Sequence, residues 1–180
     1  MGTVVTRRIP RQILLEEIRM QAPPARLFNL FTSPRSAAEL FGAAAFEYTH
    51  GNPARDNRCE ALASYNTSDM EKFLPFIPST TEKAIPSPLR ILLGRGPYYV
   101  ISHAHMGVFF QQTHINFEPA QQGGTLVTHE TTYELRPGMQ QHAGAVRCMF
   151  NAAKDHTLLT LARLSGDRQA LNTLQKYRPE

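Results

Sequence analysis

Tryptophan is absent from this sequence of 180 residues, and cysteine is rare. The two cysteines, Cys59 and Cys148, are too few and too far apart for a disulfide framework or a CxxC metal site. No apolar run approaches the roughly 18 residues that a membrane-spanning helix needs. These absences exclude a zinc finger, a secreted disulfide scaffold and a helical membrane protein. We therefore expect one soluble domain, residues 1–180, located in the cytoplasm.

Charged residues are also sparse, at 19% of the chain, whereas hydrophobic residues make up 42% and are sufficient for a sizeable core. The net charge is +4, and the densest basic group is Arg7, Arg8 and Arg11 within residues 1–11, which we expect to form a flexible N-terminus. Nucleic-acid-binding proteins usually gather basic residues on one element. The other arginines are scattered, so the sequence does not predict a nucleic-acid partner.

Motifs of several enzyme classes are missing as well. The chain has no GxSxG, no P-loop and no GxGxxG. It therefore gives no support to a serine hydrolase of the α/β type, a nucleoside triphosphatase or a dinucleotide-dependent enzyme. We expect no bound cofactor.

The N-terminal part of the chain predicts a strand, two short helices and two further strands. Residues 12–22 alternate between apolar and polar side chains, which is typical of a half-buried strand. Pro24 suits the first turn of a helix, and Ser36–Glu39 has the spacing of a capping box before a second helix that Gly42 ends. The further strands are predicted at residues 44–50 and 58–65.

The segment 66–97 differs in kind because it contains five prolines, which a central strand would not tolerate. Capping signals at Ser68–Glu71 and at Ser87–Pro88 indicate two short helices, the second of which Gly94 would end. The sequence therefore predicts an excursion of short helices and loops. Its apolar side must cover some other apolar surface.

The C-terminal half has the clearest patterns. Residues 97–106, 108–118 and 125–135 are rich in aromatic and β-branched residues, which predicts a three-stranded antiparallel meander. A long helix follows to about Leu164, where Ser165–Gly166 end it. A weaker helix is predicted at 167–177. The apolar stripe of the long helix comprises Met139, Ala143, Val146, Phe150, Ala153, Leu161 and Leu164.

Two segments resemble a known superfamily. IRMQAPPARLFNLFTSPRSAAELFG, at 18–42, and INFEPAQQGGTLVTHETTYEL, at 115–135, are similar to the strand–AP–xxx–[LV]F opening and the P–xxx–GGT–x–[VL] hairpin of the polyketide cyclase/START-related superfamily. The resemblance covers most of the chain and implies the α+β helix-grip fold. In this fold a curved antiparallel sheet wraps around a long C-terminal helix. The Pro-rich segment 66–97 departs from the superfamily pattern, and we expect it to lie over the mouth of the cavity.

The resemblance also implies a cavity between the sheet and the long helix. Members of the superfamily bind lipids, sterols, polyketides or hormones there, and some catalyse aldol-type cyclisation, aromatisation or dehydration. The fold alone does not decide between a carrier and an enzyme. The candidate site must therefore come from the residues of this chain.

Side chains of the predicted strand 125–135 alternate between an apolar and a polar set. The apolar set, expected to face inward, is Val127, His129, Thr131, Tyr133 and Leu135. An imidazole two residues from a phenol can act with it as base and proton donor on an enolisable ketone. We therefore predict His129 as a general base and Tyr133 as a hydrogen-bond donor. The alternative is a buried histidine with a satisfied hydrogen bond beside a tyrosine that only packs.

Further ligand contacts are expected from the excursion, the meander and the long helix. They are Phe76, Leu92, Tyr99, Phe110, His114, His142, Val146, Arg147 and Phe150. On the helix, His142 and Arg147 flank the apolar stripe at about 60° and about 80°. An inward arginine would suit an enolate or a carboxylate, whereas an outward one would extend into solvent.

A metal site is an alternative use of the histidines. His103 and His105 lie on one face of a predicted strand, about 7 Å apart, and His114 is close in the meander. A complete site would need another ligand on that face. The alternation of the strand also allows both histidines to face solvent, so we predict no metal.

These observations lead to two hypotheses. The first is a cofactor-independent enzyme of the polyketide cyclase type that acts on an apolar, oxygenated substrate. The second is a non-catalytic carrier of a lipid or another hydrophobic ligand. The sequence does not name the ligand, and it leaves the oligomeric state open, a homodimer included.

Overall fold

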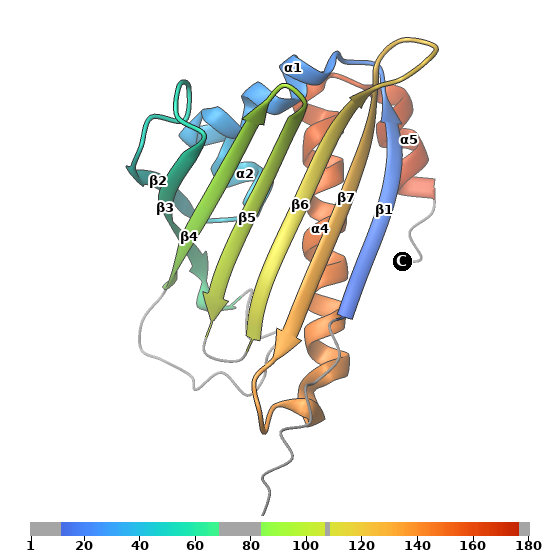
Figure 1. Ribbon diagram of the computed structural model, residues 1–180. Helices are drawn as coiled ribbons and strands as arrows, with labels where there is room; N and C mark the ends of the chain where they lie inside the picture. The colour runs from blue at the N-terminus through green and yellow to red at the C-terminus, as the bar shows by residue number, and fades with distance from the viewer. Residues whose placement is uncertain (1–11, 69–83, 107–108, 177–180) are drawn as a thin grey trace, which may run out of the picture.

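An antiparallel sheet is the framework of the protein in this computed structural model, which describes residues 12–68, 84–106 and 109–176. In the described residues the sheet has seven strands, in the order β1-β7-β6-β5-β4-β3-β2. Its strands are β1 (Gln12–Met20), β2 (Ala45–His50), β3 (Arg58–Asn66), β4 (Ala84–Arg95), β5 (Tyr98–Met106), β6 (Phe109–Pro119) and β7 (Thr125–Leu135). Figure 1 shows the described helices packed on one face of this sheet.

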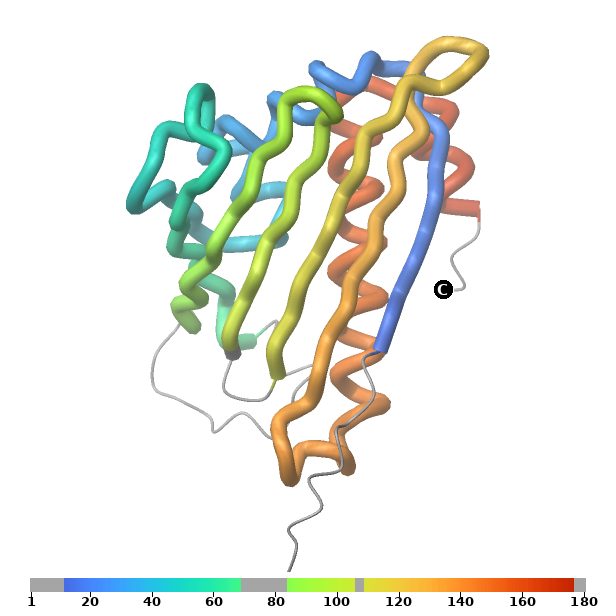
Figure 2. Tube along the Cα trace, in the orientation of Figure 1, coloured from blue at the N-terminus to red at the C-terminus, as the bar shows by residue number. Residues whose placement is uncertain are grey.

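The longest helix, α4 (Ala143–Ser165), runs across the inner face of the sheet, and the Cα trace in Figure 2 shows it behind β6, β7 and β1. A single 3₁₀ turn, η2 (Gln140–His142), precedes it. The predicted end at Ser165–Gly166 is confirmed, because Gly166 adopts a left-handed φ of 76°. The weaker predicted helix is confirmed as α5 (Arg168–Lys176).

Two short helices, α1 (Pro24–Asn29) and α2 (Pro34–Phe41), follow β1 as predicted, with a 3₁₀ turn, η1 (Leu30–Thr32), between them. The residue that precedes α2 is Ser33 and not the predicted Ser36. Gly42 ends α2 with a φ of 64°. Two side chains of α4 then hold this end: His156 donates to the Glu39 carbonyl at 2.7 Å, and Thr157 donates to the Leu40 carbonyl at 3.0 Å.

The prediction for the Pro-rich segment is wrong over residues 84–95, which form the 12-residue strand β4 and no helix. Side chains of β4 alternate, and the buried ones include Ser87, Leu89, Ile91 and Leu93. The prolines are tolerated because pairing with β5 begins only at Leu89. Pro86 and Pro88 therefore lie where β4 has β3 as its described strand neighbour, and there it behaves like an edge strand.

The other part of that prediction cannot be compared with the structure. Residues 69–83, with most of the capping box at Ser68–Glu71 and with the expected ligand contact Phe76, lie outside the described residues. The expected flexible N-terminus, residues 1–11, lies outside them as well. The predicted meander is confirmed as β5, β6 and β7.

The buried apolar residues form two clusters. The larger one joins the middle of the sheet to α1, α2 and the C-terminal half of α4. The smaller one, at the other end of α4, comprises Leu14, Phe109, Tyr133, Leu135, Val146, Met149 and Phe150. The two clusters leave room between the sheet and α4.

Candidate functional site

A cavity of about 430 Å³ lies between these clusters, walled by the sheet on one side and by α4 and the end of α2 on the other. Its volume is within the range of small-molecule sites. β3, β4, β5, β6 and β7 contribute Tyr65, Asn66, Ser87, Leu89, Ser102, Ala104, Phe109, Gln111, Thr113, Ile115, His129 and Thr131. The helical side contributes Phe41, Gly42, Met149, Phe150, Ala152, Ala153, Lys154, His156 and Thr157.

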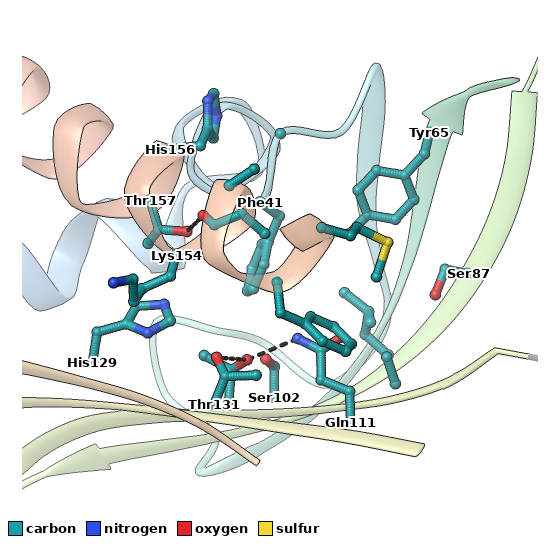
Figure 3. A pocket seen from close by; sticks show the side chains of 18 of the residues that line it. Phe41, Tyr65, Ser87, Ser102, Gln111, His129, Thr131, Lys154, His156 and Thr157 are labelled. Atoms are coloured by element: carbon teal, nitrogen blue, oxygen red, sulfur yellow. Dashed lines mark hydrogen bonds between the residues drawn. The ribbon is translucent and has the colours of Figure 1, made fainter. Parts of the chain in front are cut away.

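Three polar side chains at the centre of the sheet wall are hydrogen-bonded to one another. Thr113 and Thr131 share a hydrogen bond of 3.2 Å between their hydroxyl oxygens, and Gln111 donates its amide to the Thr113 hydroxyl at 2.8 Å. Figure 3 shows this chain of side chains along the floor of the cavity. The hydroxyl groups of Thr113 and Thr131 are therefore hydrogen-bonded without a ligand.

His129 lies at one end of the cavity, on β7, where only 3% of its surface is exposed. Its Nδ1 has no hydrogen-bond partner among the described residues. Burial and the nearby charge of Lys154 lower its pKa from 6.5 to about 4. The imidazole is therefore unprotonated at neutral pH. The inward direction predicted for this side chain is confirmed.

Lys154, from α4, lies beside His129 (Figure 3). The sequence analysis did not predict it as a site residue. It forms an ion pair with Glu16 of β1, which is the direct cross-strand neighbour of His129, and its Nζ lies 3.5 Å from Asp155. Its side chain is only 12% exposed. A signal was present, since Lys154 is four residues after Phe150 and so shares its face of the helix.

Ser87 lies at the other end of the cavity, on β4, and is 1% exposed. Its hydroxyl oxygen also has no hydrogen-bond partner among the described residues. Figure 3 shows Ser87 and His129 on opposite sides of the view, with Thr131, Ser102 and Gln111 between them. The two unpartnered polar atoms thus mark the two ends of one cavity.

Tyr133 faces inward on β7 as predicted, but it does not line the cavity. Its ring packs against Phe150, with 4.7 Å between the ring centroids, inside the smaller apolar cluster. Burial raises the pKa of its phenol, an effect that the charge of Arg147 partly opposes. The structure therefore does not bring this phenol and the His129 imidazole together on one ligand.

Of the ligand contacts expected at and near α4, one residue lines the cavity and three do not. Phe150 lines the cavity. Val146 is fully buried in the smaller cluster and does not reach the cavity. His142 precedes the first turn of α4 and Arg147 is exposed, so neither belongs to the cavity wall.

Four of the contacts expected from the strands lie on the outer face of the sheet, away from the cavity. The prediction that they line the cavity is therefore wrong. They are Leu92, Tyr99, Phe110 and His114. Successive residues of a strand point to opposite faces, and the inward neighbours here are Leu93, Val100, Phe109 and Ile115. Phe110 is 41% exposed and contacts the guanidinium of Arg136, 5.2 Å from its ring centroid.

The histidines of the metal alternative also lie on the outer face. His103 contacts the Gln112 side chain at 3.2 Å, His105 packs against Phe110, and His114 packs against Tyr99. Across residues 12–68, 84–106 and 109–176, no three His, Cys, Asp or Glu side chains are grouped so that they could hold a metal ion. No helix in these ranges has both the length and the apolar character to cross a membrane.

Comparison with solved structures identifies the fold. Zhui aromatase/cyclase from Streptomyces sp. R1128 superposes with a TM-score of 0.67 at 6% sequence identity, over 93% of this chain and 95% of that one. Norcoclaurine synthase from Thalictrum flavum gives a TM-score of 0.60 at 9% identity, over 93% and 94% of the two chains. The chain has the helix-grip fold of these structures.

A third structure with the helix-grip fold, Ara h 8.0201, gives a TM-score of 0.58 at 14% identity, over 88% of this chain and all of that one. No protein-family model and no curated protein sequence matches the chain. The resemblance of two short sequence segments predicted this fold correctly. The chemistry must be inferred from the residues of the cavity.

Proposed function

We propose that this helix-grip protein binds an apolar, oxygenated small molecule in the cavity and catalyses its cofactor-independent cyclisation or dehydration. The main support is the unprotonated imidazole of His129 beside the ammonium group of Lys154. Both groups line one end of a cavity whose helical wall is mostly apolar. A base next to a fixed positive charge is what the removal of a proton beside a ketone requires.

In the proposed reaction, a ring nitrogen of His129 takes a proton from the carbon next to a ketone of the ligand. The electron pair of that C–H bond moves onto the carbonyl oxygen, and the ammonium of Lys154 stabilises the enolate. The enolate carbon then bonds to a second carbonyl carbon of the same molecule, and the imidazolium returns its proton to the new alkoxide. For a dehydration, the imidazole takes the remaining proton from the carbon next to the ketone, the C–O bond to the new hydroxyl breaks as the C=C bond forms, and the hydroxyl takes that proton and leaves as water.

The two side chains assist one another during this step. In the free protein, the charge of Lys154 disfavours the imidazolium form of His129. Negative charge that develops on the enolate offsets this repulsion, so the imidazole becomes a stronger base as the proton moves. The role of hydrogen-bond donor, expected for Tyr133, passes to Lys154 because Tyr133 lies in the smaller apolar cluster.

A non-catalytic carrier is the second candidate function, and one observation favours it. A histidine with a pKa of about 4 is a weak base, since catalytic bases act best when their pKa is near the working pH. In a carrier, His129 would only form a hydrogen bond to the ligand. Binding and rate measurements on wild type and His129→Gln with a diketone separate the two functions.

The test uses tridecane-2,6-dione, whose intramolecular aldol condensation gives a conjugated cyclohexenone that ultraviolet absorbance detects. We expect the protein to accelerate this reaction, and we expect His129→Gln to lower kcat by about 10²- to 10⁴-fold with little change in the affinity for the dione. The matched control is His103→Gln, which makes the same change on the outer face and should keep the full rate.

Each result has a distinct meaning. Binding of the dione without any acceleration would overturn the catalytic proposal and leave the carrier. Acceleration that survives in His129→Gln would show that another group is the base. Absence of both binding and acceleration would contradict the proposed ligand class.

A further inference from the structure

We propose that the ligand of this cavity carries a hydrogen-bonding oxygen at each of its two ends, one for His129 and one for Ser87, with an apolar chain between them. This inference rests on the proposed function, because it takes the cavity as the ligand site. It narrows the ligand to an elongated, bipolar molecule. A lipid with one polar head would satisfy only one end.

Two buried polar atoms without a hydrogen-bond partner support this ligand shape. The Ser87 hydroxyl oxygen and the His129 Nδ1 are both buried, and both lack a partner among the described residues. Most buried polar groups in proteins are hydrogen-bonded, because leaving one unpaired is unfavourable. Two such atoms that face the same cavity are best explained by a ligand that pairs with both.

The distance between His129 and Ser87 also supports this ligand shape. His129 is level with Ile115, Val100 and Leu93 on the three neighbouring strands. Ser87 lies on the third of these strands, six residues before Leu93. With about 4.8 Å between strands and about 3.3 Å per residue, the two residues are offset by about 14 Å across the strands and about 20 Å along them, which gives about 24 Å along a flat sheet.

This separation decides the shape of the ligand. A near-spherical molecule that filled about 430 Å³ would be less than half as wide as the distance from His129 to Ser87. An extended chain of the same volume reaches both. Thr113, Thr131 and Gln111 already form hydrogen bonds with one another, so these side chains require no polar atom in the middle of that chain.

Straight-chain alcohols provide the test, because a hydroxyl can both donate and accept and so suits either tautomer of His129. Dodecane-1,12-diol should bind about tenfold more tightly than dodecan-1-ol, as measured by displacement of an environment-sensitive fluorescent probe. Apolar burial alone predicts the opposite order, since the second hydroxyl makes the diol more soluble in water. Hexane-1,6-diol is too short to span the cavity and should show no advantage over hexan-1-ol.

Substitution of Ser87 tests which group is responsible. Ser87→Ala should remove the advantage of the dodecanediol and leave the affinity for dodecan-1-ol unchanged. This variant should fold well, because it replaces an unpaired buried hydroxyl with an apolar group. Ser64→Ala is the matched control on the outer face of β3, where Ser64 pairs with Pro86, and it should keep the advantage.

The outcomes separate this inference from the function on which it rests. If dodecan-1-ol binds at least as tightly as the diol, or if Ser87→Ala keeps the diol advantage, the bipolar ligand is wrong and the apolar-ligand site stands. If neither dodecane compound binds, the proposed function fails together with the inference.

Discussion

The two faces of the sheet carry similar residue types but differ in what surrounds them. His129 on the inner face is buried beside Lys154, and its pKa falls to about 4. His103, His105 and His114 on the outer face contact Gln112, Phe110 and Tyr99, and they lie away from the cavity. Chemistry in this fold therefore depends on the face that a residue occupies and not on the number of histidines in a strand.

The largest expected difference between the two faces is in the pH dependence of stability. The His129 pKa is about 4 in the folded protein and about 6.5 when the chain is unfolded. The unfolded state therefore binds more protons between these values, and the free energy of unfolding should fall by about 3 kcal/mol as the pH decreases from 6.5 to 4. Above pH 6.5 this contribution is fully present.

Urea unfolding at both pH values measures this effect. His129→Gln should lose that part of the pH dependence, whereas His103→Gln should keep the wild-type dependence. An identical pH dependence in wild type and His129→Gln would show that His129 is not held neutral by its surroundings.

A smaller difference, in ligand affinity, is expected when a larger side chain is placed on one face or on the other. Ala104 lies on the cavity floor, and its neighbour His103 points to the outer face. Ala104→Phe should lower the affinity for dodecan-1-ol by about tenfold, because the new ring occupies space that the ligand needs. His103→Phe should leave this affinity unchanged. Equal effects of both variants, with thermal unfolding as a check on folding, would contradict the position of the cavity.

Most of the fold could be predicted from the sequence, because local signals agree with the tertiary structure. Gly42 and Gly166 end helices where the pattern indicates, and the alternation along β7 gives the correct inward set. The exception is β4, where Pro86 and Pro88 were interpreted as signs of helix and loop. Their place beyond the β5 pairing depends on strand register, which no local pattern contains.

The candidate site was only partly predictable. His129 follows from alternation, and Phe150 follows from the helical stripe. Tyr99 and Phe110 are expected in the cavity, but they lie on the outer face of the sheet. Helical spacing places Lys154 on the face of Phe150, but its ion pair with Glu16 of β1 depends on the pairing of distant segments. Ser87 could not be singled out, because it faces a cavity that α4 completes.

The central claim is that His129 is a neutral imidazole that contacts the ligand inside the cavity. The most direct measurement is an NMR pH titration of the His129 ring, assigned by its absence in His129→Gln, with and without dodecane-1,12-diol. We expect a pKa of about 4 in the free protein, and a change in the ring resonances of His129 but not of His103 when the diol is added. A pKa near 6.5 together with unchanged His129 resonances would contradict it.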